Sequence, residues 1–97
     1  MHPISVRVKD FQGIVLDPSG AILPDTQIEV LRRDNVDGSP VAKIQADSTG
    51  HFSAHPSKGI FVAIFQHLGF KSFVSVFEVS NEGKENLLIT LEVGGVT

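Results

Sequence analysis

The residues of this sequence with the clearest chemical potential are its histidines, because imidazole can act as an acid, a base or a metal ligand near neutral pH. His51 and His55 fall in one short predicted strand, four residues apart and therefore on one face. At ~3.3 Å per residue their Cα atoms lie about 13 Å apart, which is too far for one metal ion to bind both. We interpret both as exposed polar positions of the strand. His67 follows an apolar run, and we interpret it as a residue at the rim of the fold.

A second candidate is a cluster of oxygen-bearing side chains, because carboxylates and amides are the ligands that Ca²⁺ prefers. Asp34, Asn35 and Asp37 supply such oxygens in one polar segment. The segment lacks the full calcium-loop pattern and a glutamate placed for bidentate ligation. We therefore interpret it as an ordinary loop between two strands.

Nucleophilic catalysis has no recognisable motif in this sequence. Every serine of the turns lies outside a nucleophile-elbow pattern, and no glycine-rich phosphate loop is present. The sequence contains no cysteine, which excludes disulfides and thiolate metal sites. We therefore predict no catalytic, cofactor-binding or metal-binding residue, and no cofactor.

Composition indicates a single globular domain over residues 1–97. The hydrophobic fraction is 41% and the charged fraction is 20%, which is typical of a chain that buries one core. The net charge of −3 does not favour binding to nucleic acid or to an anionic membrane. No apolar run reaches the length that crosses a bilayer, so we expect no membrane insertion.

The elements that position these side chains are short strands separated by turns. The segment 17–20 (DPSG) has the order of a type I turn, and 47–50 (DSTG) is a second turn that ends on glycine. Alternating and continuous apolar runs between such turns predict seven strands, at 6–16, 27–33, 41–46, 51–55, 60–68, 71–79 and 86–93. No segment has helical periodicity long enough for a core helix. The predicted fold class is all-β, a seven-stranded Greek-key sandwich.

The strand pattern also predicts which residues form the core. The expected core residues alternate along their strands and are Ile28, Val30, Ile44, Phe52, Phe61, Ala63, Phe65 and Leu91. Gly50 and Gly69 are expected at positive φ, because each follows a turn sequence. Gly13 interrupts an apolar strand, which indicates a bulge or a close approach of another backbone.

Four local patterns occur in one order and carry a family resemblance. They are 13–21 (GIVLDPSGA) followed by Leu23-Pro24, the strand 28–30 (IEV), the turn 47–52 (DSTGHF), and 59–61 (GIF) leading to Gly69-Phe70. Together they resemble the carboxypeptidase regulatory-like domains, which have the transthyretin-like (prealbumin-like) β-sandwich fold. The resemblance covers residues 11 to about 93. It implies a non-catalytic module of the kind that supports folding or assembly, with no ligand general to the family.

The same fold has one enzymatic branch, the hydroxyisourate hydrolases. Their signature is a histidine before Val-Leu-Asp and a Tyr-Arg-Gly-Ser carboxyl terminus. Ile14 stands at the histidine position here, and the sequence contains no tyrosine. On this basis we expect that the chain is not an enzyme.

The resemblance therefore favours a structural or interaction module, an accessory domain of a secreted or cell-envelope bacterial protein. The alternative is a module that binds a small ligand or a carbohydrate, although phenylalanine is the only aromatic residue and a sugar platform normally uses Trp or Tyr. The expected location is extracytoplasmic, periplasmic or secreted. Residues 1–4 (MHPI) lack the basic start and the apolar core of a signal peptide.

The last feature is an apolar strip on the face that should meet water. If Phe61 and Phe65 point into the core, the residues that alternate with them point outward. The strip that results, if the strands at 60–68 and 71–79 are neighbours, consists of Ile60, Val62, Ile64, Val74 and Val76. Either residues 4–8 or a loop cover this strip, or it is an interface for a protein partner. The expected partner is a second copy in a homodimer or a domain of a parent protein.

Overall fold

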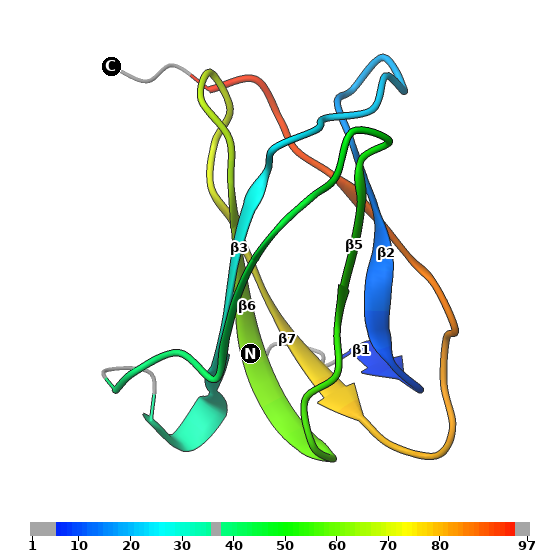
Figure 1. Cartoon of the computed structure of the whole chain (residues 1–97), viewed down its shortest axis with the longest axis vertical. Helices are drawn as coiled ribbons and strands as arrows, with labels where there is room; N and C mark the ends of the chain where they lie inside the picture. The colour runs from blue at the N-terminus through cyan, green and yellow to red at the C-terminus, as the bar shows by residue number, and fades with distance from the viewer. Residues whose placement is uncertain (1–5, 36–37, 95–97) are drawn as a thin grey trace, which may run out of the picture.

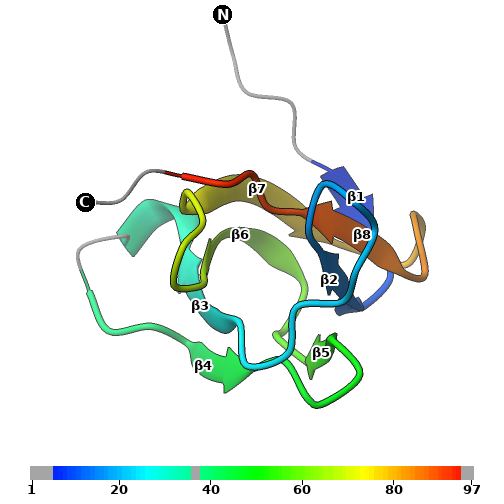
Figure 2. The ribbon, with the colours of Figure 1, turned by 90° about the horizontal axis from the view of Figure 1, so that it is seen from above.

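The computed structural model describes residues 6–35 and 38–94, which fold into two packed β-sheets. The first sheet has five strands in the order β1-β7-β6-β3-β4, and the second has three in the order β5-β2-β8. The strands are β1 (Val6–Val8), β2 (Phe11–Leu16), β3 (Gln27–Arg32), β4 (Ala42–Gln45), β5 (His51–Ala54), β6 (Gly59–Gln66), β7 (Phe73–Val79) and β8 (Leu87–Thr90). A 3-10 turn, η1 (Arg33–Asn35), follows β3. The two layers are seen edge-on in Figure 1, and Figure 2 shows that the sheets curve toward each other where β4 approaches β5.

The all-β sandwich is confirmed. The predicted count of seven strands is wrong, because the single strand expected at residues 6–16 consists of two strands, β1 and β2. β1 pairs in parallel with β7 of the first sheet, and β2 pairs in parallel with β8 of the second. The chain changes sheets at Lys9 and Asp10, where the Asp10 carboxylate accepts a hydrogen bond from the Phe11 amide at 3.0 Å. The alternation shifts by one residue at this crossing: Val6 and Val8 face the core before it, whereas Phe11 and Val15 face the core after it.

Phenylalanine rings from both sheets form the centre of the core. Phe11 of the three-stranded sheet contacts Phe77 of the five-stranded sheet, with ring centroids 5.2 Å apart. Phe52 contacts Phe65 in the same way at 5.4 Å. Edge-to-face pairs of this kind contribute beyond the apolar area that they bury. These four rings therefore hold the two layers together.

Most of the predicted core is confirmed. Seven of the eight expected side chains are buried, namely Ile28, Val30, Phe52, Phe61, Ala63, Phe65 and Leu91. Ile44 is only partly buried, because β4 is the edge strand of its sheet. Gly50 and Gly69 have φ values of +80° and +89°, as predicted from their turns.

Two turns share one pattern of hydrogen bonds to an aspartate side chain. The first turn follows β2, and the second precedes β5. In the first, the Asp17 Oδ1 atom accepts hydrogen bonds from the Ser19 hydroxyl at 2.7 Å and from the Ser19 and Ala21 amides. In the second, the Asp47 Oδ1 atom accepts from the Thr49 hydroxyl at 2.7 Å and from two backbone amides. The hydroxyl hydrogen bonds are the largest cause that lowers the pKa of both carboxyls below 3.8, because they stabilise the ionised form.

This design predicts a pH-dependent effect of Asp47→Asn. A carboxyl whose pKa is lowered on folding stabilises the native state above its unfolded pKa, and this contribution is lost as the pH falls through the lower folded value. We therefore expect the variant to have a reduced Tm near neutral pH, and the difference from the parent to shrink as the pH falls below 3.8. Thermal unfolding across this pH range, with Glu92→Gln as an exposed control, measures the effect. A Tm difference that stays constant to low pH would contradict the role of the charge.

Candidate functional site

The outer face of the three-stranded sheet carries a row of polar side chains from its edge strand. Phe52 and Ala54 of β5 point into the core, so His51 and Ser53 between them are exposed on the opposite face. His55 continues this row just after the strand ends. The row confirms that the two histidines share a face, as their spacing predicts.

Asp10, Ser53 and His55 form a connected set on this face. The His55 Nδ1 atom lies 3.1 and 3.0 Å from the two carboxylate oxygens of Asp10. The Nε2 atom on the other side of the ring lies 3.5 Å from the Ser53 hydroxyl. The pairing of Phe11 with Ala54 between β2 and β5 places Asp10 next to His55, although the two are 45 positions apart in sequence. One imidazole is thus held between a carboxylate and a hydroxyl.

This arrangement has the polarity that general acid–base chemistry requires. A carboxylate on Nδ1 fixes the tautomer in which Nδ1 carries the proton, and it leaves the Nε2 lone pair directed at the hydroxyl. The 3.5 Å contact is at the long limit of a hydrogen bond, as catalytic contacts without substrate often are. The side chains of His55 and Asp10 are 73% and 38% exposed, so the set is open to substrate and to water.

A surface hollow of about 330 Å³ adjoins Ser53. Its lining includes Gln12, His51, Ser53 and Asn86. Gln12 is the direct cross-strand partner of Ser53, and its amide nitrogen donates to the Glu85 carbonyl at 3.0 Å. A primary amide has two N–H groups, and among the described residues the Gln12 amide donates one hydrogen bond, to Glu85. The hollow is small, and amide, hydroxyl and imidazole side chains line it beside apolar surface, which suits a compact molecule with polar groups.

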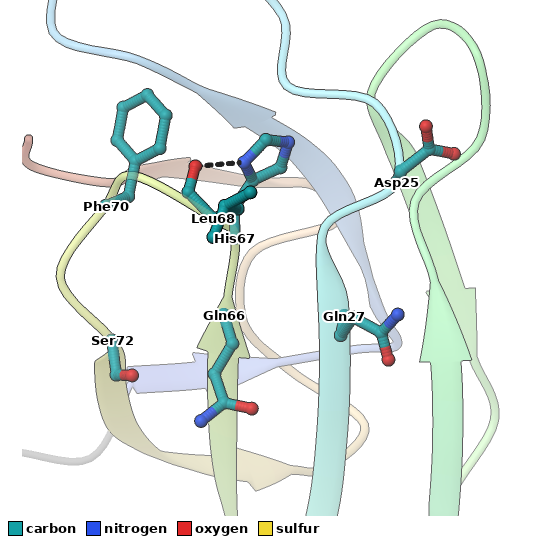
Figure 3. Close-up of a pocket in the computed structure, with 7 residues that line it drawn as sticks. All are labelled: Asp25, Gln27, Gln66, His67, Leu68, Phe70 and Ser72. Carbon is teal, nitrogen blue, oxygen red and sulfur yellow. Dashed lines mark hydrogen bonds between the residues drawn. The ribbon is translucent and has the colours of Figure 1, made fainter. Parts of the chain in front are cut away.

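A second hollow, of about 450 Å³, lies at one end of the five-stranded sheet (Figure 3). It is lined by Asp25, Gln27, Gln66, His67, Leu68, Phe70 and Ser72. Both ring nitrogens of His67 face carbonyl oxygens, with Nδ1 3.0 Å from that of Leu68 and Nε2 3.1 Å from that of Pro24. A neutral imidazole has one N–H, so His67 donates to one of these two carbonyls and thereby links the chain at this rim.

The other sequence-based candidates give no further site. The His51 Nδ1 atom contacts the Thr49 hydroxyl at 2.8 Å, within the turn before β5. Asp37 of the proposed oxygen cluster lies outside the described residues, so that cluster is not tested. Within residues 6–35 and 38–94, no three His, Asp or Glu side chains are grouped as metal ligands. In the same residues no helix has the length and apolar character to span a bilayer.

Sequence reasoning did not identify the Asp10–Ser53–His55 set. The two-residue spacing of Ser53 and His55 was a usable signal, because it places both on one face of a strand. Asp10 had no such signal, since its position depends on the pairing of β2 with β5.

Comparison with known proteins identifies the fold. No family model and no curated protein matches the sequence. Among solved structures, 5-hydroxyisourate hydrolase from Klebsiella pneumoniae matches with a TM-score of 0.63 and 16% sequence identity, over 95% of this chain and 93% of that chain. The transthyretin-like fold is therefore confirmed, whereas no family model links the chain to the carboxypeptidase regulatory-like domains.

This comparison corrects the functional expectation. A non-catalytic structural or interaction module, with ligand or carbohydrate binding as its alternative, was inferred from a family resemblance. A solved structure that matches nearly the whole chain is an enzyme, which contradicts that inference and leaves the expectation of a non-enzyme unsupported. At 16% identity, the likeness itself shows the fold and not an activity.

Proposed function

We propose that this chain is a hydrolase of a small polar substrate, with Asp10, Ser53 and His55 as its acid–base centre. The observation that carries the proposal is the contact of His55 with a carboxylate on one ring nitrogen and a hydroxyl on the other. The neighbouring hollow gives space for the substrate beside Ser53. The likeness to a solved hydrolase supports the class of reaction.

The proposed centre uses residues other than the signature of the hydroxyisourate hydrolases. Ile14 stands at the position of their histidine, and an aliphatic side chain cannot transfer a proton. His51 is the cross-strand partner of Ile14, and Ser53 is the next outward residue along β5. The same face of the sheet would thus carry hydrolytic chemistry with a different set of side chains.

In this proposal each residue has one role. Asp10 orients His55, and the Nε2 atom of His55 takes the proton of the Ser53 hydroxyl as its oxygen attacks the substrate carbonyl carbon. The second amide N–H of Gln12 donates to the oxygen that becomes negatively charged. His55 then gives the proton to the leaving group, and a water molecule releases the acyl product from Ser53 by the same steps.

The test is the hydrolysis of 5-hydroxyisourate and of a small ester, p-nitrophenyl acetate, by the purified full chain. We expect His55→Ala and Ser53→Ala each to lower kcat/KM by about 10²-fold or more, the range for loss of a positioned acid–base group. Ser57→Ala and His67→Gln, which change the same residue types away from this face, are the controls and should keep the parent rate. All variants are compared below their Tm.

Two results would reject this function. One is a parent protein whose rate with both substrates equals that of buffer. The other is a His55→Ala protein as active as the parent, which would place any hydrolysis elsewhere on the chain.

A further inference from the structure

The outer face of the five-stranded sheet carries the apolar strip predicted from the sequence, here called the β6–β7 strip: Ile60, Val62, Ile64, Val74 and Val76. β6 and β7 are antiparallel neighbours, and Val62 lies opposite Val76 as Ile64 lies opposite Val74. Val74 is 58% exposed and Ile60 is 40% exposed, while the other three are partly buried. Five aliphatic side chains thus form one continuous surface, on the sheet that does not carry the proposed hydrolytic centre.

The described part of the N-terminal segment does not cross this strip. Val6–Val8 forms β1, which lies beside β7 at the edge of the sheet (Figure 2). Val8 is buried and Val6 packs against the core, so both side chains point inward. Ile4 belongs to the segment 4–8 that was expected as a possible cover of the strip, and it lies outside the described residues.

Charged side chains border the strip and balance one another. On the β1 side, Arg7 Nε lies 3.5 Å from a Glu78 carboxylate oxygen. On the β4 side, Lys43 Nζ lies 3.8 Å from a Glu29 carboxylate oxygen. Each border therefore carries one positive and one negative charge, so two identical faces brought together meet no net repulsion. A neutral apolar centre with a mixed-charge rim is self-complementary, as a two-fold interface requires.

The size of the face also fits a second copy. The molecule measures 32 × 27 × 27 Å, and the five-stranded sheet is the larger of its two layers. One side of a molecule with these dimensions is comparable with the ~800 Å² that each partner buries in a standard interface. A contiguous apolar patch on a small domain usually marks such a contact.

We propose that the β6–β7 strip is the interface of a homodimer in which two copies of this chain pack face to face through their five-stranded sheets. The two sheets would stack as β-sheets do in sandwiches, with apolar side chains of both copies interleaved. The contact is independent of the hydrolytic centre, so either proposal can fail alone.

Sedimentation velocity of the full chain over a wide concentration range tests the dimer. The parent should show a concentration-dependent shift from monomer to dimer. Val62→Lys combined with Val74→Glu should weaken self-association by about 100-fold or more, because burying these charges at the contact is strongly unfavourable. Leu88→Lys combined with Thr90→Glu adds the same charges to the outer face of the other sheet and should leave the dimer unchanged.

A charge-pairing experiment checks that the β6–β7 strip of one copy contacts the β6–β7 strip of the other copy. A doubly lysine variant and a doubly glutamate variant, both at Val62 and Val74, should each be monomeric alone and should associate when mixed. Circular dichroism must show that each variant is folded; if the double variants unfold, the single exposed change Val74→Lys is used instead. The proposal is overturned if the parent is monomeric at every concentration or if the strip variants still dimerise. It is also overturned if Val74→Lys unfolds the chain, because the strip would then be covered by the chain's own residues.

Discussion

Replacing Phe65 with alanine should lower the free energy of unfolding by about 3–5 kcal/mol, the usual cost of removing a buried aromatic side chain. Phe65 is 0% exposed and lies where the two sheets meet. Its ring contacts Phe11 and Phe52 of the opposite sheet and Phe73 of its own. Three rings would lose a partner at once, and the cavity cannot close without moving one sheet relative to the other. Because small domains are stable by only about 5–15 kcal/mol in total, we expect a large loss of the native state.

Chemical denaturation followed by circular dichroism measures this effect. Phe73→Ala is the matched control, because Phe73 contacts the same ring but is 36% exposed at the end of β7. It should cost clearly less than Phe65→Ala. Equal costs for the two variants would mean that Phe65 is not the centre of the core.

The second large effect is expected from Gly13→Ala, which should destabilise the protein by about 1–3 kcal/mol or more. Gly13 lies within β2 between Phe52 of β5 and Leu87 of β8. A Cβ atom at this position would lie 2.2 Å from the Leu87 carbonyl oxygen and 2.9 Å from its Cβ. The obstacle is the backbone of a neighbouring strand, which cannot rotate away as a flexible side chain does. The alanine would therefore push β8 away from β2.

Gly20→Ala separates this steric effect from the general cost of losing a glycine. Gly20 has a φ of +89° in an exposed turn, and nothing lies within 4 Å of its added Cβ. The Gly20→Ala variant should lose only the ~1–2 kcal/mol of folding stability that a left-handed conformation costs an L-residue. If Gly13→Ala is no more harmful than Gly20→Ala, then β8 does not approach β2 as closely as the structure places it.

The proposed hydrolytic centre and the core place different requirements on the residues of β5. Phe52 and Ala54 must remain buried for the sheets to pack, while Ser53 and His55 are free to vary without loss of the fold. Substitutions of Ser53 and His55 should therefore change activity while leaving stability nearly unaltered, which makes the kinetic comparison interpretable. Val74 is exposed on the opposite sheet, so substitutions of Val74 should likewise change self-association while leaving stability nearly unaltered.

Local sequence determined most of the strands and, for most of their residues, the side that faces the core. Phe61, Ala63 and Phe65 are buried as predicted, because side chains alternate along any strand whatever its partners are. The positive φ of Gly50 and Gly69 was equally predictable, because turn chemistry depends on a few adjacent residues. The neighbouring outward positions followed from the same alternation, and they define the β6–β7 strip.

Tertiary structure alone decided which strands are neighbours. Residues 6–16 read as one strand, yet hydrogen bonding divides them between two sheets. Ile44 fits the alternating pattern but is only partly buried, because β4 is an edge strand. Asp10 meets His55 only through the register of β2 on β5. A sequence pattern with a period of two specifies the face of a residue but not its partner across the sheet, and it is the partner that assembles a carboxylate, an imidazole and a hydroxyl into one site.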